Sequence, residues 1–405
     1  MTAWWRQLTG RLAAGWLRLA PARRRTAACR LQAAEQQLTR GAAATSARLA
    51  AVRELVTIAD TYQGRYKQRV VDLLCAHLRA GTAAEPGMVR AEVPQENNAV
   101  AAGAVPPRTA EPGVSAPADP VQALVLAEIA RHLARGRARR AASRQPSASA
   151  TGVPSAGAVP KEPVVPASSW AQCGFDLRGV HLTADVNWAD CYFAGPVCFA
   201  GAVLDGEVQL RGATFRDGPD FSSARFRSAV DCSQAKFGAA ASFRQASFAR
   251  RTTFAHSRFG ARADFSDCLF AAAPPGGPAV DGYQPPPSDT YFSSARFGPE
   301  VSFHRAVFRG YAMFPFARFA AAPCFRAARF ELAASFYGAR LGTGADFRDT
   351  TFLPGRQRPR YLDDLLDAQL TSFDTAKFGP GATFAGANFA SRVSFTAATG
   401  ASVVS

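Results

Sequence analysis

A large apolar residue recurs every five or six residues from Leu177 to Phe395, and this spacing restricts the fold more than any other property of the chain. The steps alternate between five and six residues, so that two steps make an eleven-residue double repeat. Two interruptions, residues 271–291 and 353–372, separate three runs that together hold 35 such positions, of which 28 are Phe. Since the whole chain has 30 Phe, nearly every Phe belongs to the repeat.

A short fixed period is typical of a solenoid, in which each unit packs only against its neighbours. Recurring Gly and Pro, as at Gly212, Gly218 and Pro219, exclude a helical repeat. Each short segment instead offers two inward residues, a small one and a large one two positions later, which predicts stacked parallel rungs about 4.8 Å apart. The predicted core includes Phe215, Phe221, Phe226, Phe237, Phe243, Phe248, Phe254, Phe259, Phe265, Phe303, Phe308, Phe314, Phe319, Phe325, Phe330 and Phe336.

The repeated runs A-T-F-R-D, A-R-F-R-S, A-K-F-G-A, A-S-F-A-R, A-R-F-G-P and A-N-F-A-S resemble pentapeptide-repeat proteins of the phenylalanine-rich kind. The resemblance covers residues 171–398 and implies a mainly β fold, a right-handed quadrilateral β-helix solenoid of roughly nine coils with four short faces per coil. Because every second step has six residues, a coil would take 22 residues, with bulges at two corners. Residues 48–55 and 69–79 resemble the helical region that precedes the repeats in members from GC-rich bacteria, which suggests an actinobacterial type.

The region before the repeats divides into three parts by composition. Residues 1–25 form a basic amphipathic segment, residues 26–140 a small α-helical region with a disordered insertion at 82–118, and residues 141–169 a flexible linker to the β-helix at 170–405. We expect Ser46 to cap one helix, a second helix to end near Gly81, and Asp119-Pro120 to begin a third. The third helix leads into a basic cluster at residues 135–144.

The positive charge is concentrated before the repeats. Residues 1–170 carry 23 Lys and Arg against 11 Asp and Glu, whereas residues 171–405 carry 24 against 20. The segment 1–25 has Trp at helical spacing and no acid, so it either packs on the following helices, docks on an anionic membrane, or binds a partner protein or nucleic acid. The residues predicted to contact a membrane or polyanion are Trp4, Trp5, Arg11, Trp16, Arg18, Arg23, Arg24 and Arg25.

The outward residues that directly precede the large apolar positions form ladders if four faces make one coil and the interruptions leave the phase unchanged. One face then carries Tyr192, Thr214, Lys236, Arg258, Arg296, Arg318, Arg340 and Lys377, and the next carries Asp176, Cys198, Asp220, Ser242, Asp264, Ser302, Cys324, Asp346 and Thr383. We call Lys236, Arg258, Arg296, Arg318, Arg340 and Lys377 the basic ladder. Like charges at rung spacing repel, so the favoured interpretation is pairing with carboxylates across the corner. Binding of a polyanion is the alternative.

Residues that would carry catalysis do not converge in this sequence. The eight Cys show no metal-ligand spacing and are expected to be reduced, mostly buried thiols, and the His are dispersed. We therefore expect no enzyme activity, no cofactor and no metal. Neither a secretory leader nor an apolar run long enough to span a membrane is recognised, so a cytoplasmic location is expected, with docking at the inner face of the membrane as an option.

These observations predict a non-catalytic interaction scaffold that binds a macromolecular partner, most simply a protein, through the β-helix surface and its two loops. Three alternatives remain: mimicry of duplex DNA to bind DNA gyrase, as some pentapeptide-repeat proteins do, direct nucleic-acid binding, and membrane-surface binding through the basic segments. A DNA mimic should be strongly acidic, and residues 171–405 are not. The C-terminal coil, which ends without an obvious cap, is predicted to allow a homodimer.

Overall fold

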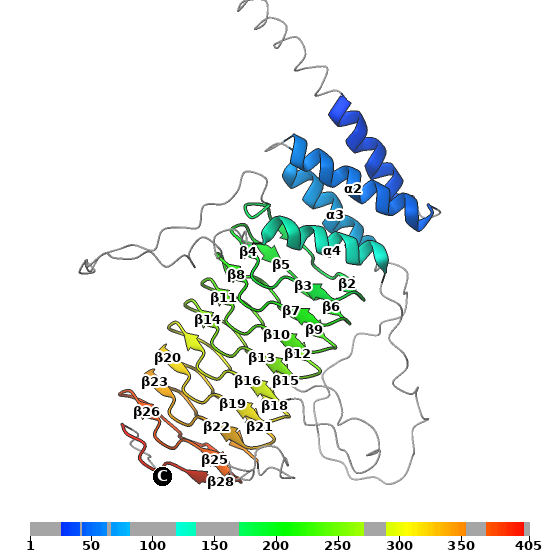
Figure 1. The fold of residues 1–405 in the computed structure, drawn as a ribbon. Coiled ribbons are helices and arrows are strands. Elements are labelled where there is room, and N and C mark those ends of the chain that lie inside the picture. Colours follow the sequence, from blue (N-terminus) through cyan, green and yellow to red (C-terminus); the bar gives the residue numbers. More distant parts are fainter. Residues whose placement is uncertain are drawn as a thin grey trace, which may run out of the picture.

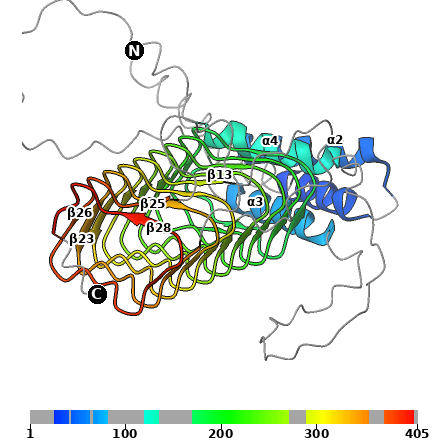
Figure 2. The same ribbon diagram turned by 90° about the horizontal axis from the view of Figure 1, so that it is seen from below.

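The computed structural model of the chain describes residues 26–40, 43–62, 66–81, 119–134, 170–270, 289–353 and 370–400. In this part of the chain, helices precede a long parallel β-helix and lie at its N-terminal end (Figure 1). Figure 2 shows the coils as stacked loops, with the helices at one end and the C-terminal coil at the other. The mainly β solenoid predicted from the spacing is confirmed.

The β-helix has four faces, numbered here in chain order. The first consists of β1 (Phe175–Asp176), β5 (Val197–Cys198) and single-residue bridges that continue from Cys198 to Thr383. The second consists of β2 (His181–Leu182), β6 (Val203–Leu204), β9 (Arg225–Phe226), β12 (Ser247–Phe248), β15 (Leu269–Phe270), β18 (Val307–Phe308), β21 (Arg329–Phe330), β24 (Thr351–Phe352) and β27 (Asn388–Phe389).

The third and fourth faces are likewise continuous parallel sheets. The third consists of β3 (Val186–Asn187), β7 (Val208–Gln209), β10 (Val230–Asp231), β13 (Thr252–Thr253), β16 (Thr290–Tyr291), β19 (Ala312–Met313), β22 (Ala334–Ser335), β25 (Leu370–Ser372) and β28 (Arg392–Ser394). The fourth consists of β4 (Tyr192–Phe193), β8 (Thr214–Phe215), β11 (Lys236–Phe237), β14 (Arg258–Phe259), β17 (Arg296–Phe297), β20 (Arg318–Ala321), β23 (Arg340–Thr343) and β26 (Lys377–Phe378).

The register confirms the 22-residue coil. Lys236 pairs with Thr214 on one side and with Arg258 on the other, each 22 residues away in the chain. The two interruptions do not shift this phase, because Arg258 pairs with Arg296 and Arg340 pairs with Lys377. Both interruptions therefore leave and re-enter the coil at the same corner.

Turns that contain a residue in the left-handed conformation explain why the repeat alternates between steps of five and six residues. In each five-residue step a backbone N–H bonds to the carbonyl oxygen three residues earlier, as in Ala224 to Phe221 at 3.1 Å. The residue just before the donor has positive φ, as at Ser223 with φ 56°, and this recurs every eleven residues. The six-residue corner after the fourth face has a left-handed residue of its own at Ala240, Arg262 and Glu300.

The axis of the β-helix is filled by stacked aromatic rings. All the Phe residues predicted for the core are buried, and rings on consecutive rungs lie nearly parallel, as for Phe243 and Phe265 with centroids 4.8 Å apart. Rings of neighbouring faces meet edge to face, as for Phe303 and Phe314 at 5.7 Å and 89°. The edge-to-face arrangement is one that the ring quadrupole favours. The small residues two positions earlier, such as Ala213, Ala224 and Ala235, are fully buried beside them.

Four helices precede the β-helix in the described residues: one over residues 26–39, α2 (Thr45–Thr61), α3 (Lys67–Ala80) and α4 (Pro120–Leu133). The predicted cap of α4 is confirmed, since the Asp119 carboxylate accepts a hydrogen bond from the Val121 N–H at 2.9 Å. The cap predicted for α2 is wrong. The residue before this helix is Ala44, which offers no capping side chain, and Ser46 already lies within the first turn.

Two glutamine side chains tie the helices to the open edge of the first coil. The amide of Gln122 in α4 donates to the His181 carbonyl oxygen at 3.0 Å and accepts from the Thr183 N–H at 3.0 Å. The amide of Gln68 in α3 makes the same pair of bonds with Gly174, both at 2.9 Å. Each side chain thus replaces the peptide group of a missing rung. Free sheet edges expose unpaired backbone groups, and these glutamines satisfy some of them.

The Gln122→Leu variant should be less stable than the parent by about 1–3 kcal/mol. The substitution keeps the side chain's approximate size but leaves the Thr183 N–H and His181 carbonyl without the partner they have in a nearly buried place. Urea unfolding followed by circular dichroism measures the change. The matched control is Gln37→Leu on the exposed surface of the first helix. Equal midpoints for the two variants would show that the amide does not cap the edge.

Candidate interaction surface

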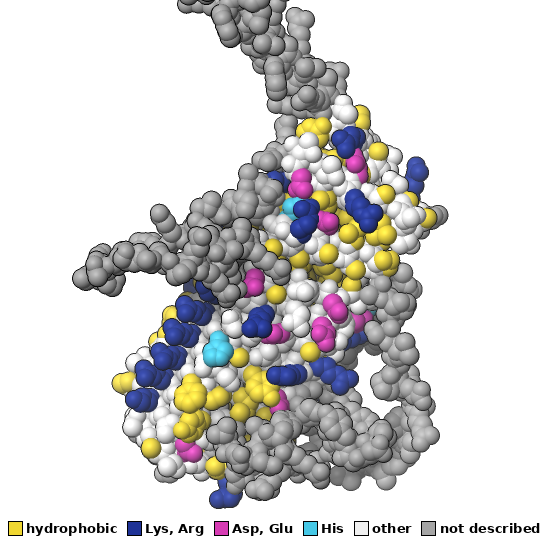
Figure 3. Space-filling view, viewed as in Figure 1, with side chains coloured by type: hydrophobic (Ala, Val, Ile, Leu, Met, Phe, Trp, Pro, Cys, Tyr) yellow, Lys and Arg dark blue, Asp and Glu magenta, His cyan; other side chains and the backbone are white. Residues whose placement is uncertain are grey.

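The six cations of the basic ladder lie on consecutive rungs of the fourth face. Their backbone register runs without a gap from Lys236 through Arg258, Arg296, Arg318 and Arg340 to Lys377. Figure 3 shows a continuous row of basic side chains along one edge of the β-helix. The predicted stacking of these residues is therefore confirmed.

The alternation along each two-residue strand points the cations outward. In β14 the Arg258 side chain is exposed, whereas Phe259 is 4% exposed and stacks on Phe237 at 4.8 Å. Successive residues of a strand face opposite sides, so a Phe locked into the axis fixes the direction of the residue before it. The buried stack therefore holds the six cations on one line.

The predicted pairing of the ladder with carboxylates across the corner is wrong. Among the residues that the structure describes, no cation of the ladder forms an ion pair with a carboxylate. The acidic residues of the first face bond locally instead. Asp346 binds Arg348 at 2.8 Å, and the carboxylates of Asp220 and Asp264 accept backbone N–H bonds from Ser222 and Ser266. In the structure, these locally bonded carboxylates form no ion pair with the ladder cations.

Asp176 shows how firmly this local bonding holds a first-face carboxylate. It accepts two bonds from the Arg178 guanidinium, at 2.8 and 2.9 Å, and one from Arg79 of α3 at 2.5 Å. Hydrogen bonds from Arg178, and then from Arg79, hold the pKa of the Asp176 carboxyl well below its usual range. The same contacts join α3 to the first coil.

Other arginines of the β-helix form ion pairs with acidic side chains. Arg227 lies 3.2 Å from Asp205, Arg305 lies 3.0 Å from Asp267, and Arg326 lies 3.3 Å from Asp349. Glu300 lies at the corner four residues after Arg296, but it is exposed, and within the described residues no ion pair joins it to the ladder. The basic ladder is thus a line of positive charge that its own protein leaves uncompensated within the described residues.

A line of six cations suits an extended anionic partner. Rungs about 4.8 Å apart place the first and last cations about 24 Å from one another along the axis. Each cation is exposed and screened by salt, so its repulsion of the next is small, but their summed potential attracts polyanions. The geometry fits a linear acidic chain better than a compact anion, because no cluster of donors converges on one point.

Two exposed aromatic residues border the ladder, and the sequence did not identify them. Phe316 is 55% exposed and Tyr337 is 42% exposed, and their ring centroids lie 5.5 Å apart in an edge-to-face arrangement. A signal existed in the sequence: Phe175 and Phe316 are the two Phe outside the repeat positions. Phe175 is buried in the first coil, which leaves Phe316 as the exception.

Several predicted interaction residues lie outside the described part of the chain. These are Trp4, Trp5, Arg11, Trp16, Arg18, Arg23, Arg24 and Arg25, the basic cluster from residue 135 onward, and most of the two interruptions. All eight cysteines are free thiols, and most are buried. Within the described ranges no group of three or more His, Cys, Asp and Glu is arranged to hold a metal ion. None of the helices described is long and apolar enough to cross a membrane.

The geometry defines the class first: a parallel β-helix with four faces, a 22-residue coil and a ladder of Phe on each face. In the comparison with known families, residues 199–244 match the family model described as pentapeptide repeats (9 copies). This stretch lies within the β-helix, so the chain contains pentapeptide repeats, which follow a helical region. No curated protein and no solved structure matches it.

Proposed function

We propose that this chain is a non-catalytic interaction scaffold that binds an acidic macromolecule through the basic ladder. The observation that supports the proposal is the uncompensated row of six cations, held in register by the stacked Phe residues behind them. A surface that only needed solubility would gain more from mixed charges, as on the neighbouring faces, than from six like charges in line.

Removing three ladder charges, with Arg296→Gln, Arg318→Gln and Arg340→Gln combined, should weaken binding of inorganic polyphosphate to the full chain. For a single-stranded polyanion each neutralised phosphate contributes about 0.7 to the slope of log K against log salt, so the slope should become shallower by about 2. The affinity is measured by titration at several salt concentrations between about 50 and 200 mM.

The control removes three arginines that already have carboxylate partners, Arg305→Gln, Arg326→Gln and Arg329→Gln. The two triple variants have the same net charge and the same basic N-terminal segment, so a difference between them depends on where the charge is lost and not on how much is lost. We expect the control to keep most of the parent slope. An equal change of slope in both variants, or no change in either, contradicts a specific role of the ladder.

A further inference from the structure

Phe316 departs from the rule that the other Phe residues follow. Of the Phe in the described residues, it is the one whose ring lies mostly in solvent, and Phe316 and Tyr337 are the two large hydrophobic residues exposed there. They are adjacent, since the Phe316 N–H donates to the Tyr337 carbonyl oxygen at 2.8 Å. In a structure that buries its aromatic residues so systematically, an exposed pair at one place calls for a physical reason.

The backbone conformation at Phe316 is also unusual for a residue with a large side chain. This residue occupies the left-handed turn position with φ 57°, where a bulky side chain is an outlier. On other rungs the equivalent position holds a polar residue, glycine or alanine: Asp190, Gly212, Gln234, His256, Ser294, Gly338, Thr375 and Ala397. Strained backbone positions are concentrated at functional sites, so a bulky aromatic residue in this conformation points to a function for its side chain.

The ring of Phe316 lies directly beside the basic ladder. Phe316 precedes Arg318 by two residues, on the turn that leads into β20. Its ring extends over the next rung, because a Cβ added to Gly338 would lie 2.8 Å from the Phe316 ring atoms. Gly338 in turn precedes Arg340 by two residues. The ring is therefore held between the rungs of two ladder cations, and Figure 3 shows apolar side chains next to the basic row.

We propose that the basic ladder, Phe316 and Tyr337 together bind single-stranded nucleic acid, an inference that rests on the function proposed above and specifies its partner. The phosphates lie along the cations, and unpaired bases stack on the two exposed rings. Positive grooves bordered by aromatic side chains are the usual means of binding single strands without regard to sequence. Duplex DNA keeps its bases stacked inside, and an acidic polypeptide gains nothing specific from the rings.

The test compares fluorescein-labelled (dT)20, a 20-base-pair duplex, polyglutamate and inorganic polyphosphate as probes for the full chain. Phe316→Ala should weaken (dT)20 binding by roughly 5- to 100-fold, the loss expected when one base no longer stacks. It should leave polyphosphate affinity within about twofold, because no ring contact is lost there. Phe316→Tyr, which keeps a ring at the same position, should retain the affinity for (dT)20.

The outcomes separate this inference from the proposed function. If the triple ladder variant loses affinity for every probe but Phe316→Ala binds (dT)20 as the parent does, the scaffold proposal stands and the single-strand inference is overturned. Tighter binding of polyglutamate or duplex than of (dT)20 overturns it as well. If the triple ladder variant and its matched control bind every probe equally well, the ladder is not the binding surface, and the proposed function is overturned together with the single-strand inference. Thermal melting of Phe316→Ala should match the parent, since the ring is largely exposed.

Discussion

Replacing Phe303 by Ala should lower the free energy of unfolding by about 3–5 kcal/mol. The Phe303 ring is fully buried between Phe265 and Phe325, each with its centroid 4.9 Å away and nearly parallel. It also meets Phe292 and Phe314 edge to face. Truncation therefore opens a cavity at the centre of the aromatic axis, where rigid rungs on both sides cannot collapse into it. Urea unfolding, with the midpoint and the slope both reported, measures the loss.

Two controls test whether the loss depends on the size of the side chain and on its place in the β-helix. Phe303→Leu should cost less, about 1.5 kcal/mol or below, because Leu177 already occupies the equivalent buried place on the first face of the first coil. Phe395→Ala removes a ring that is only partly buried in the last coil, where one side of the stack is open, and should also cost less. A loss below about 1 kcal/mol for Phe303→Ala would mean that the axis repacks.

The register of the β-helix could be predicted from the sequence because the repeat leaves little freedom. A 22-residue coil follows from the alternating five and six steps, and a one-residue slip would move every Phe out of the core. The same argument placed Lys236 beside Arg258 and Arg258 beside Arg296, although an interruption separates the second pair. Burial of the large residues fixes the positions of the outward ones.

Side-chain pairing could not be predicted in the same way. The sequence placed an acidic ladder beside a basic one, but the carboxylate of Asp346 turns to Arg348, two residues along its own chain, and does not cross the corner. Such a choice depends on rotamers and local turn geometry, which the repeat period does not specify. Phe316 was missed for a similar reason. The sequence shows that Phe316 is not at a repeat position, but only the fold shows that its side chain is exposed near Arg318.

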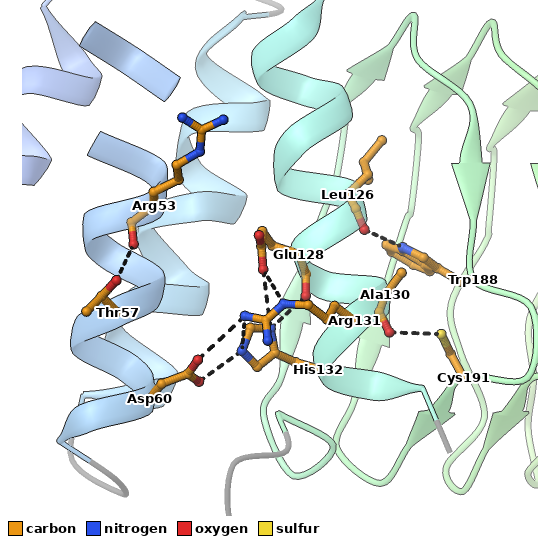
Figure 4. Close-up of polar contacts among 10 residues, drawn as sticks. All are labelled: Arg53, Thr57, Asp60, Leu126, Glu128, Ala130, Arg131, His132, Trp188 and Cys191. Atoms are coloured by element: carbon orange, nitrogen blue, oxygen red, sulfur yellow. Dashed lines mark hydrogen bonds and ion pairs between the residues drawn. The ribbon is translucent and has the colours of Figure 1, made fainter. Parts of the chain in front are cut away.

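The contact between the helices and the first coil could not be predicted from the sequence either. Trp170 is fully buried and stacks on His132 of α4 with ring centroids 4.0 Å apart, while His132 contacts Asp60 of α2 at 2.9 Å. Figure 4 shows these helices against the first strands, with the Trp188 indole N–H donating to the Leu126 carbonyl oxygen at 3.3 Å. A fragment that begins after Trp170 would expose this edge, so binding experiments require the full chain.

Replacing Gly298 by Ala should destabilise the protein by about 1–3 kcal/mol or more and disturb the basic ladder at the same time. Gly298 follows Arg296-Phe297 on the fourth face, and a Cβ added there would lie 2.6–2.7 Å from the backbone at Gly260 and Ala261 on the previous rung. Real Cβ atoms do not approach backbone so closely, so one rung must move away from the other. That movement would lengthen the hydrogen bond from the Gly298 N–H to the Phe259 carbonyl oxygen, now 2.9 Å.

The matched control is Gly81→Ala at the end of α3, where the backbone has an ordinary helical φ of −61° and no atom lies within 4 Å of an added Cβ. There the substitution should be neutral or stabilising by about 0.4–1 kcal/mol, because it only restricts the unfolded chain. Calorimetric melting of both variants gives the comparison. Because Arg296 and Arg318 are aligned by the same rungs, Gly298→Ala should also weaken polyphosphate binding, and Gly81→Ala should not. Equal stability and equal binding for the two variants would show that close approach of the rungs at Gly298 neither constrains the fold nor aligns the ladder.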